Sequence, residues 1–91
     1  MNQKAKDPRI ESVDFSELIL GFSSAALYYM GHQTSEGTSE DINTALALQN
    51  IKIIEMLKLK SKGNLTTNEL ILIDKILLDL NEKYNELEKK S

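Results

Sequence analysis

The stretch of sequence that decides the fold is Lys60-Ser61-Lys62-Gly63-Asn64-Leu65-Thr66-Thr67-Asn68-Glu69. It separates two long segments whose apolar residues recur at helical spacing. Gly63 suits the left-handed backbone position that closes many helices, because it has no Cβ to clash. Thr66 and Glu69 have the spacing of a capping box, in which a hydroxyl and a carboxylate each accept a backbone N–H. Two helices joined by so few residues are expected to form a long antiparallel hairpin.

The helix after this turn is predicted to run from about Thr67 to Glu88. Its apolar residues alternate spacings of three and four, which is typical of a coiled-coil-like seam. The seam consists of Leu70, Ile73, Leu77, Leu80, Tyr84 and Leu87. Further apolar residues lie off the seam, so this helix is apolar on more than one side.

The helix before the turn is predicted to begin at a capping pattern of Thr38 and Asp41 and to end near Lys62. Its main apolar face is expected to consist of Ile42, Ala45, Leu46, Gln49, Ile53, Met56 and Leu57. A second apolar face consists of Leu48, Ile51 and Ile54. Like its successor, this helix has more apolar surface than one neighbour can cover.

A first helix is predicted to begin near Asp14 or Ser16 and to end at Gly31. Its apolar stripe consists of Phe15, Leu18, Ile19, Phe22, Ala25, Ala26, Tyr29 and Met30. Small residues within the helix allow a second helix to approach closely. The sequence therefore predicts an all-α protein of three helices, with structural caps at Gly31, Gly63, Thr66 and Glu69.

A helix in a monomeric three-helix bundle needs one apolar stripe, and all three helices here have more than one. Large exposed apolar patches mark interfaces. We therefore expect a homo-oligomeric bundle, with an oligomer interface on the first helix. The expected interface residues are Leu18, Phe22, Ala25 and Tyr29. The alternative is that the extra faces bind another protein.

The 91 residues are enough for one helical domain, predicted to span residues 14–91. Residues 1–13 are polar, lack periodicity and hold the only proline, Pro8, which predicts a flexible N-terminal arm. The apolar run from Leu18 to Met30 is too short to span a membrane. No secretory signal is evident at the start of the chain, and there is no cysteine. A cytoplasmic protein without a membrane span is expected.

The sequence predicts no catalytic, cofactor-binding or metal site. His32 is the only histidine, and it lies in a polar loop without acids at metal-ligand spacing. Glu55 has lysines three residues before and after it, which is typical of surface ion pairs. Asp74 and Asp79 do not have the helical spacing of a shared site. The protein is therefore expected to be a non-enzymatic interaction or scaffold module.

The alternative function is a regulatory protein that associates with RNA or the ribosome through the basic end of the second helix. Lys58, Lys60 and Lys62 lie there, together with Lys52. No aromatic residue interleaves with these lysines, and the only arginine is Arg9. The net charge of −3 gives no overall attraction to nucleic acid. Nucleic acid is therefore not the expected partner.

One further pattern extends from Phe15 to Leu87, and its most specific part is a Gly-Asn-Leu-Thr turn. The residues that match it are Phe15, Ser16, Met30, Gly31, Ala47, Ile51, Leu57, Lys60, Gly63, Asn64, Leu65, Thr66, Glu69, Leu80 and Tyr84. With them, the chain resembles a small bacterial family, domain of unknown function 1844. The resemblance implies an all-helical, cytoplasmic bacterial protein and attaches no activity to it.

The chain departs from the family pattern at three positions. It has Lys52 where family members tend to have Asp, and Leu48 where they tend to have Arg or Lys. A role for that charge pair does not carry over to this chain. Ser61 replaces the usual Thr, which is a mild change.

Overall fold

The computed structural model describes residues 14–32 and 41–90, and these form three helices without a strand. They are α1 (Phe15–Tyr29), α2 (Thr44–Lys60) and α3 (Thr67–Lys90). The prediction of an all-α protein with three helices is confirmed. The predicted flexible arm, residues 1–13, lies outside the described residues.

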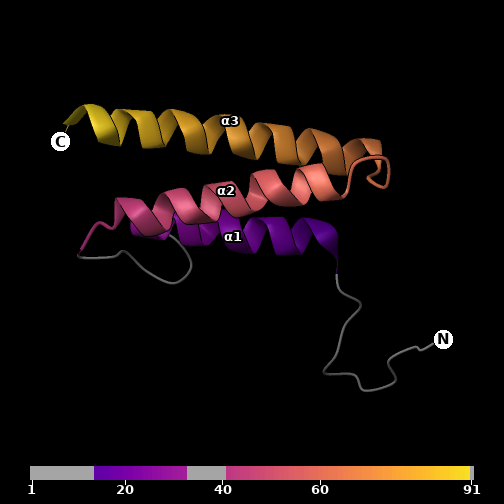
Figure 1. Ribbon diagram of the computed structural model, residues 1–91, viewed down its shortest axis with the longest axis horizontal. Coiled ribbons are helices and arrows are strands. Elements are labelled where there is room, and N and C mark those ends of the chain that lie inside the picture. Colours follow the sequence, from indigo (N-terminus) through magenta and orange to yellow (C-terminus); the bar gives the residue numbers. More distant parts are fainter. Residues whose placement is uncertain (1–13, 33–40, 91) are drawn as a thin grey trace, which may run out of the picture.

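The three helices pack side by side, and each is in contact with both others. In Figure 1 the chain reverses after α1 and again after α2, and α2 lies between the other two helices in that view. A backbone hydrogen bond spans the first reversal. The Asn43 N–H donates to the Tyr29 carbonyl at 2.8 Å. The end of α3 returns to this junction, where Leu87 and Ile42 line the same hollow.

Short polar side chains start the first two helices. Asp14 is the N-cap of α1, and its carboxylate accepts a hydrogen bond from the Ser16 N–H at 3.1 Å. Asn43 is the N-cap of α2, and its Oδ1 accepts from the Leu46 N–H at 3.0 Å. Of the predicted start at Thr38 and Asp41, Thr38 lies outside the described residues, and the part at Asp41 is wrong. Asp41 precedes the helix, and Asn43 is the residue that satisfies an otherwise unpaired backbone donor.

Two glycines with positive φ follow the ends of α1 and α2. Gly31 has φ 88°, and the His32 N–H donates to the Leu27 carbonyl while the Gly31 N–H donates to the Tyr28 carbonyl. This pair of bonds is a Schellman motif, which satisfies carbonyls left open at a helix end. Gly63 has φ 87° in the turn after α2. The C-cap of α2 is Ser61, so the helix ends two residues before the predicted Lys62.

A reciprocal pair of hydrogen bonds starts α3. The Thr66 hydroxyl accepts from the Glu69 N–H at 3.1 Å, and the Glu69 carboxylate accepts from the Thr66 N–H at 2.9 Å. This is the capping-box geometry, and it satisfies two backbone donors at once. The helix continues two residues beyond the predicted end, to Lys90.

The core lies along the line where the three helices meet. Its buried apolar residues are Ile19, Ala26, Met30, Ala47, Ile51, Ile54, Ile73 and Leu80. The face of α2 that enters it is the one expected to be secondary, through Ile51 and Ile54. The predicted main face is wrong, since Ala45, Gln49 and Met56 are exposed. Both faces of α2 are apolar, and packing between α1 and α3 decides which one is buried.

We predict that Gly63→Val destabilises the fold more than Ser61→Val. A β-branched residue at the left-handed position of Gly63 costs about 2 kcal/mol, although an added Cβ meets no atom within 4 Å. Ser61→Val removes the hydrogen bond from Oγ to the Leu57 carbonyl, and we expect a cost of under about 1 kcal/mol because the site is only partly buried. Chemical denaturation at one fixed protein concentration measures both changes. An equal or reversed order would contradict a conformational role for Gly63.

We predict that Thr66→Ala lowers the free energy of unfolding by about 1 kcal/mol, because the Glu69 N–H loses its acceptor. Thr67→Ala is the matched control, since Thr67 is exposed and is already inside the helix. Chemical denaturation of the two variants gives the comparison. A larger loss from Thr67→Ala would show that the cap does not stabilise α3.

Candidate functional site

The four predicted interface residues lie along one side of α1, which we call the α1 flank. Leu18 is 41% exposed, while Phe22, Ala25 and Tyr29 are half-buried. Leu18, Phe22 and Ala25 line one shallow hollow, and Ala25 and Tyr29 line the next one along the helix. Within the single chain the flank is open, so its apolar side chains are accessible from outside.

Small residues form the middle of the α1 flank. Gly21 and Ala25 are one helical turn apart, and both line both hollows. A Cβ added to Gly21 would meet no other atom within 4 Å, so packing inside the protomer does not require glycine there. The missing side chain instead leaves the backbone of α1 open to close approach from outside.

A buried amide from α2 lines the same flank. Asn50 is only 9% exposed and lines the hollow that contains Glu17, Leu18 and Phe22. Its Nδ2 donates to the Leu46 carbonyl at 2.8 Å. Its Oδ1 accepts no hydrogen bond from residues 14–32 or 41–90. Because Asn50 borders the open hollow, its Oδ1 has capacity for one donor from outside the chain.

Sequence reasoning missed Asn50, because a polar residue within a helix is usually exposed. The signal that could have found it is its register. Ala47, Asn50, Ile51 and Ile54 have the spacing of one helix face, and all four are buried. Once Ile51 and Ile54 are assigned to the core, Asn50 must lie beside them.

Two tyrosines form the other end of the α1 flank. Tyr28 and Tyr29 line one hollow with Gly21 and Ala25. Their rings meet edge to face, with centroids 5.5 Å apart. Tyr29 also packs against the core. The flank therefore has phenol groups at one end and the oxygens of Glu17 and Asn50 at the other.

A second apolar surface lies beside the turn between α2 and α3. Leu59, Leu65 and Leu70 line a hollow of about 550 Å³, all of whose lining residues come from α2, the turn and α3. Leu59 is 69% exposed. Leu65 and Leu70, which flank the Thr66–Glu69 capping box, thus lie in the same hollow. Further along α3, Leu78 is 65% exposed.

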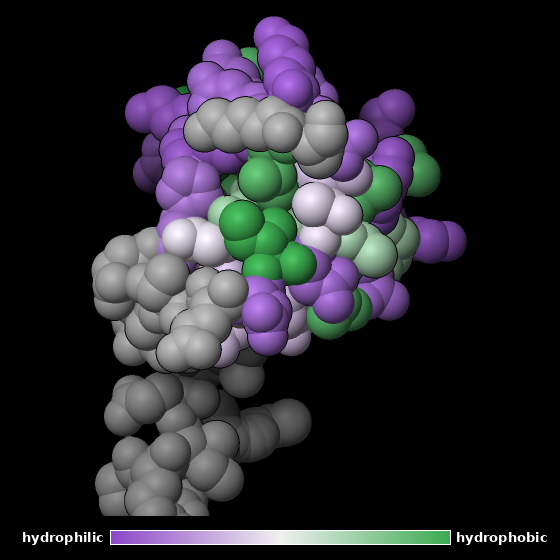
Figure 2. Space-filling view, turned by 90° about the vertical axis from the view of Figure 1, so that its left-hand side faces the viewer, coloured by the Kyte–Doolittle hydropathy of each residue, from purple (hydrophilic) through white to green (hydrophobic). Residues whose placement is uncertain are grey.

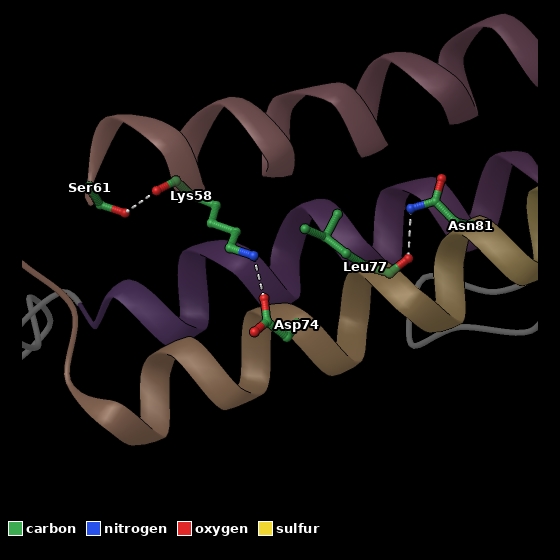
Figure 3. A network of polar contacts seen from close by, with 5 residues as sticks. All are labelled: Lys58, Ser61, Asp74, Leu77 and Asn81. Carbon is green, nitrogen blue, oxygen red and sulfur yellow. Dashed lines mark hydrogen bonds and ion pairs between the residues drawn. The ribbon is translucent and has the colours of Figure 1, made fainter. Parts of the chain in front are cut away.

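An ion pair links the two helices at this hollow. Figure 3 shows the Lys58 side chain reaching from α2 to Asp74 on α3, where Nζ and Oδ1 are 2.6 Å apart. Both side chains remain about half exposed, so solvent weakens the attraction. A second ion pair lies within α2, where Lys52 Nζ is 3.6 Å from Glu55 Oε1. Two of the lysines from the basic end of α2 thus have a neighbouring carboxylate.

A smaller apolar cluster lies at the opposite end of the bundle. Met30, Ile42 and Leu87 line a hollow there, with Lys83 and Glu86 at its edge. Figure 2 looks onto this end of the bundle and shows apolar atoms gathered among hydrophilic ones. Ile42 precedes α2 and is 53% exposed, although it lines this hollow.

The described part of the chain holds one histidine and no group of His, Asp or Glu residues suited to a metal ion. That histidine, His32, is exposed. Desolvation raises the pKa of the Tyr84 phenol above its ordinary value, and the nearby Glu88 carboxylate adds repulsion and accepts a hydrogen bond from it. The phenol therefore keeps its proton at neutral pH. None of the described helices is long and apolar enough to cross a membrane.

The model of one protein family, a domain of unknown function (DUF1844), matches residues 12–86. The chain belongs to the DUF1844 family. The matched span includes α1, α2 and most of α3, so the α1 flank, Asn50 and the turn before α3 are all parts of the family domain. No curated protein and no solved structure matches the chain.

We predict that the Lys58–Asp74 ion pair contributes less than about 1 kcal/mol to stability, because both partners are exposed. A double-mutant cycle with Lys58→Met and Asp74→Asn, measured by chemical denaturation, isolates the pairwise energy. The coupling is expected to fall as salt is added. A coupling of several kcal/mol that salt leaves unchanged would contradict this assignment.

Proposed function

We propose that this DUF1844 protein is a small non-enzymatic interaction module that self-associates through the α1 flank. The observation that carries the proposal is the open flank itself. It combines an exposed Leu18, half-buried aromatic rings and a stretch of backbone uncovered at Gly21. Apolar surface of this kind is stabilised when a partner removes it from water.

In the proposed oligomer, α2 and α3 form an antiparallel helical hairpin that supports α1 from one side. Ile51 and Ile54 of α2 and Ile73 of α3 are fully buried or nearly so, which gives the flank a rigid base. A short chain buries a modest share of its surface, so association adds stability that the protomer lacks. The absence of cysteine fits a reducing compartment, and a bacterial cytoplasmic location is part of the proposal.

A role in RNA binding is less well supported. Lys58 is already paired with Asp74, and Lys52 with Glu55. Lys60 lies in the last turn of α2, where the negative end of the helix dipole opposes a bound phosphate. Ion pairs within the chain and the helix dipole thus account for Lys52, Lys58 and Lys60 without a bound phosphate.

We predict that the purified protein has a concentration-dependent mass greater than that of one chain in sedimentation equilibrium at micromolar protein. Leu18→Gln should weaken self-association, because it places a polar amide on the α1 flank. Leu20→Gln is the matched control. Leu20 is 47% exposed, and residues two apart on a helix point about 160° away from each other.

A well-folded monomer at every concentration would sink the proposed function. If Leu20→Gln weakened association and Leu18→Gln did not, the protein would self-associate through a different side of α1. Circular dichroism of both variants checks that the helices remain folded.

A further inference from the structure

The α1 flank has two ends of opposite hydrogen-bonding character. The phenols of Tyr28 and Tyr29 can donate at one end, while Glu17 and the Oδ1 of Asn50 can only accept at the other. Gly21 and Ala25 lie between the ends and belong to both hollows. A surface with donors at one end and acceptors at the other complements a copy of itself turned end to end.

Sequence position shows which groups then meet. Gly21 and Ala25 are equally far from position 23, and so are Leu18 and Tyr28. When two α1 helices cross antiparallel at this position, Gly21 of one copy lies opposite Ala25 of the other. The tyrosine hollow of each copy then covers the hollow that contains Asn50. Such a two-fold arrangement uses the same patch on both chains.

The direction of the side chains favours the same pairing. Side chains on a helix lean toward its N-terminus. In an antiparallel pair, Tyr28 and Tyr29 of the second copy lie near the level of Leu18 of the first copy. Their lean moves the phenols toward the level of Phe22 of the first copy, beside its Asn50. A parallel pairing instead places Glu17 against the Glu17 of the other copy and brings no tyrosine to Asn50.

We propose that two copies of this chain pair antiparallel through α1, in close contact at Gly21 and Ala25, with a tyrosine phenol of each copy donating a hydrogen bond to Asn50 Oδ1 of the other. This inference rests on the proposed function, since it specifies the partner and geometry of the same surface. In this dimer Asn50 Oδ1 accepts a hydrogen bond, and the missing side chain of Gly21 allows the two helices to approach closely.

Substitution at Gly21 tests the close contact. Gly21→Leu fits the single chain, where a Cβ at residue 21 meets no other atom within 4 Å. In the dimer, both copies place the larger side chain in the close contact. We expect the dissociation constant of the dimer to rise at least about thirtyfold, while the helical circular dichroism is retained. Ala45→Leu is the matched control, because Ala45 is exposed on α2 and does not line the flank. Its dissociation constant should equal that of the wild type.

Substitution of the polar groups tests the hydrogen bond. Removing both phenols with Tyr28→Phe and Tyr29→Phe together should raise the dissociation constant about tenfold, because two symmetry-related bonds are lost. The same double substitution in an Asn50→Ala background should add little, since the acceptor is already gone. Fully additive effects would overturn the phenol-to-Asn50 contact.

Cross-linking tests the orientation, and the absence of native cysteine makes it direct. In the antiparallel pair, two copies of residue 18 are about 15 Å apart along the helix axis, too far for a disulfide. Oxidation should therefore leave Leu18→Cys alone uncrosslinked and should link it to Tyr28→Cys in a mixture of the two variants. Cross-linking of Leu18→Cys to itself would overturn the antiparallel pairing.

The outcomes separate the two proposals. A wild-type protein that is monomeric at all concentrations removes both the proposed function and this inference. A dimer that Leu18→Gln weakens but Gly21→Leu leaves intact overturns this inference alone, because the α1 flank is then the interface without close contact at Gly21.

Discussion

The structure depends on the burial of one face of α2 against both of its neighbours. Ile51 and Ile54 are fully buried, and they can be so only if α1 and α3 both lie alongside α2. Each of the two chain reversals that make this possible contains a glycine with positive φ. Gly31 and Gly63 adopt that backbone conformation at little energetic cost, whereas residues with a Cβ are strained there. The hydrophobic core and the two turns therefore require each other.

The ends of the helices were more predictable from the sequence than their faces. Helix ends depend on local hydrogen bonds. A Thr-x-x-Glu pattern or a glycine after an apolar run therefore predicts a helix end from the sequence alone. The turn from Gly63 to Glu69 follows the pattern closely. The predicted start of α2 was wrong because the side chain of Asn43 caps the helix, and the sequence does not show that the Asn43 N–H also donates a backbone hydrogen bond to the Tyr29 carbonyl.

The buried face of α2 could not be read from its pattern, because apolar residues surround that helix. Met56 and Leu59 are exposed although their side chains are as apolar as those of Ile51 and Ile54. The choice between the faces is made by contacts with helices far away in the sequence. The same dependence hid Asn50, whose burial follows from that choice. On α1, the single predicted stripe divides between the core, at Ile19 and Ala26, and the α1 flank, at Leu18.

Asn50 has a consequence for selectivity. A wholly apolar flank would accept almost any apolar helix of suitable shape, because burial of apolar surface is not directional. A buried carbonyl oxygen without a donor changes this, since covering it with an apolar side chain costs about 1–3 kcal/mol. The Asn50 oxygen thus penalises partners that lack a donor at that point and leaves partners that have one almost unaffected. A single amide can in this way increase the specificity of a surface without increasing its affinity.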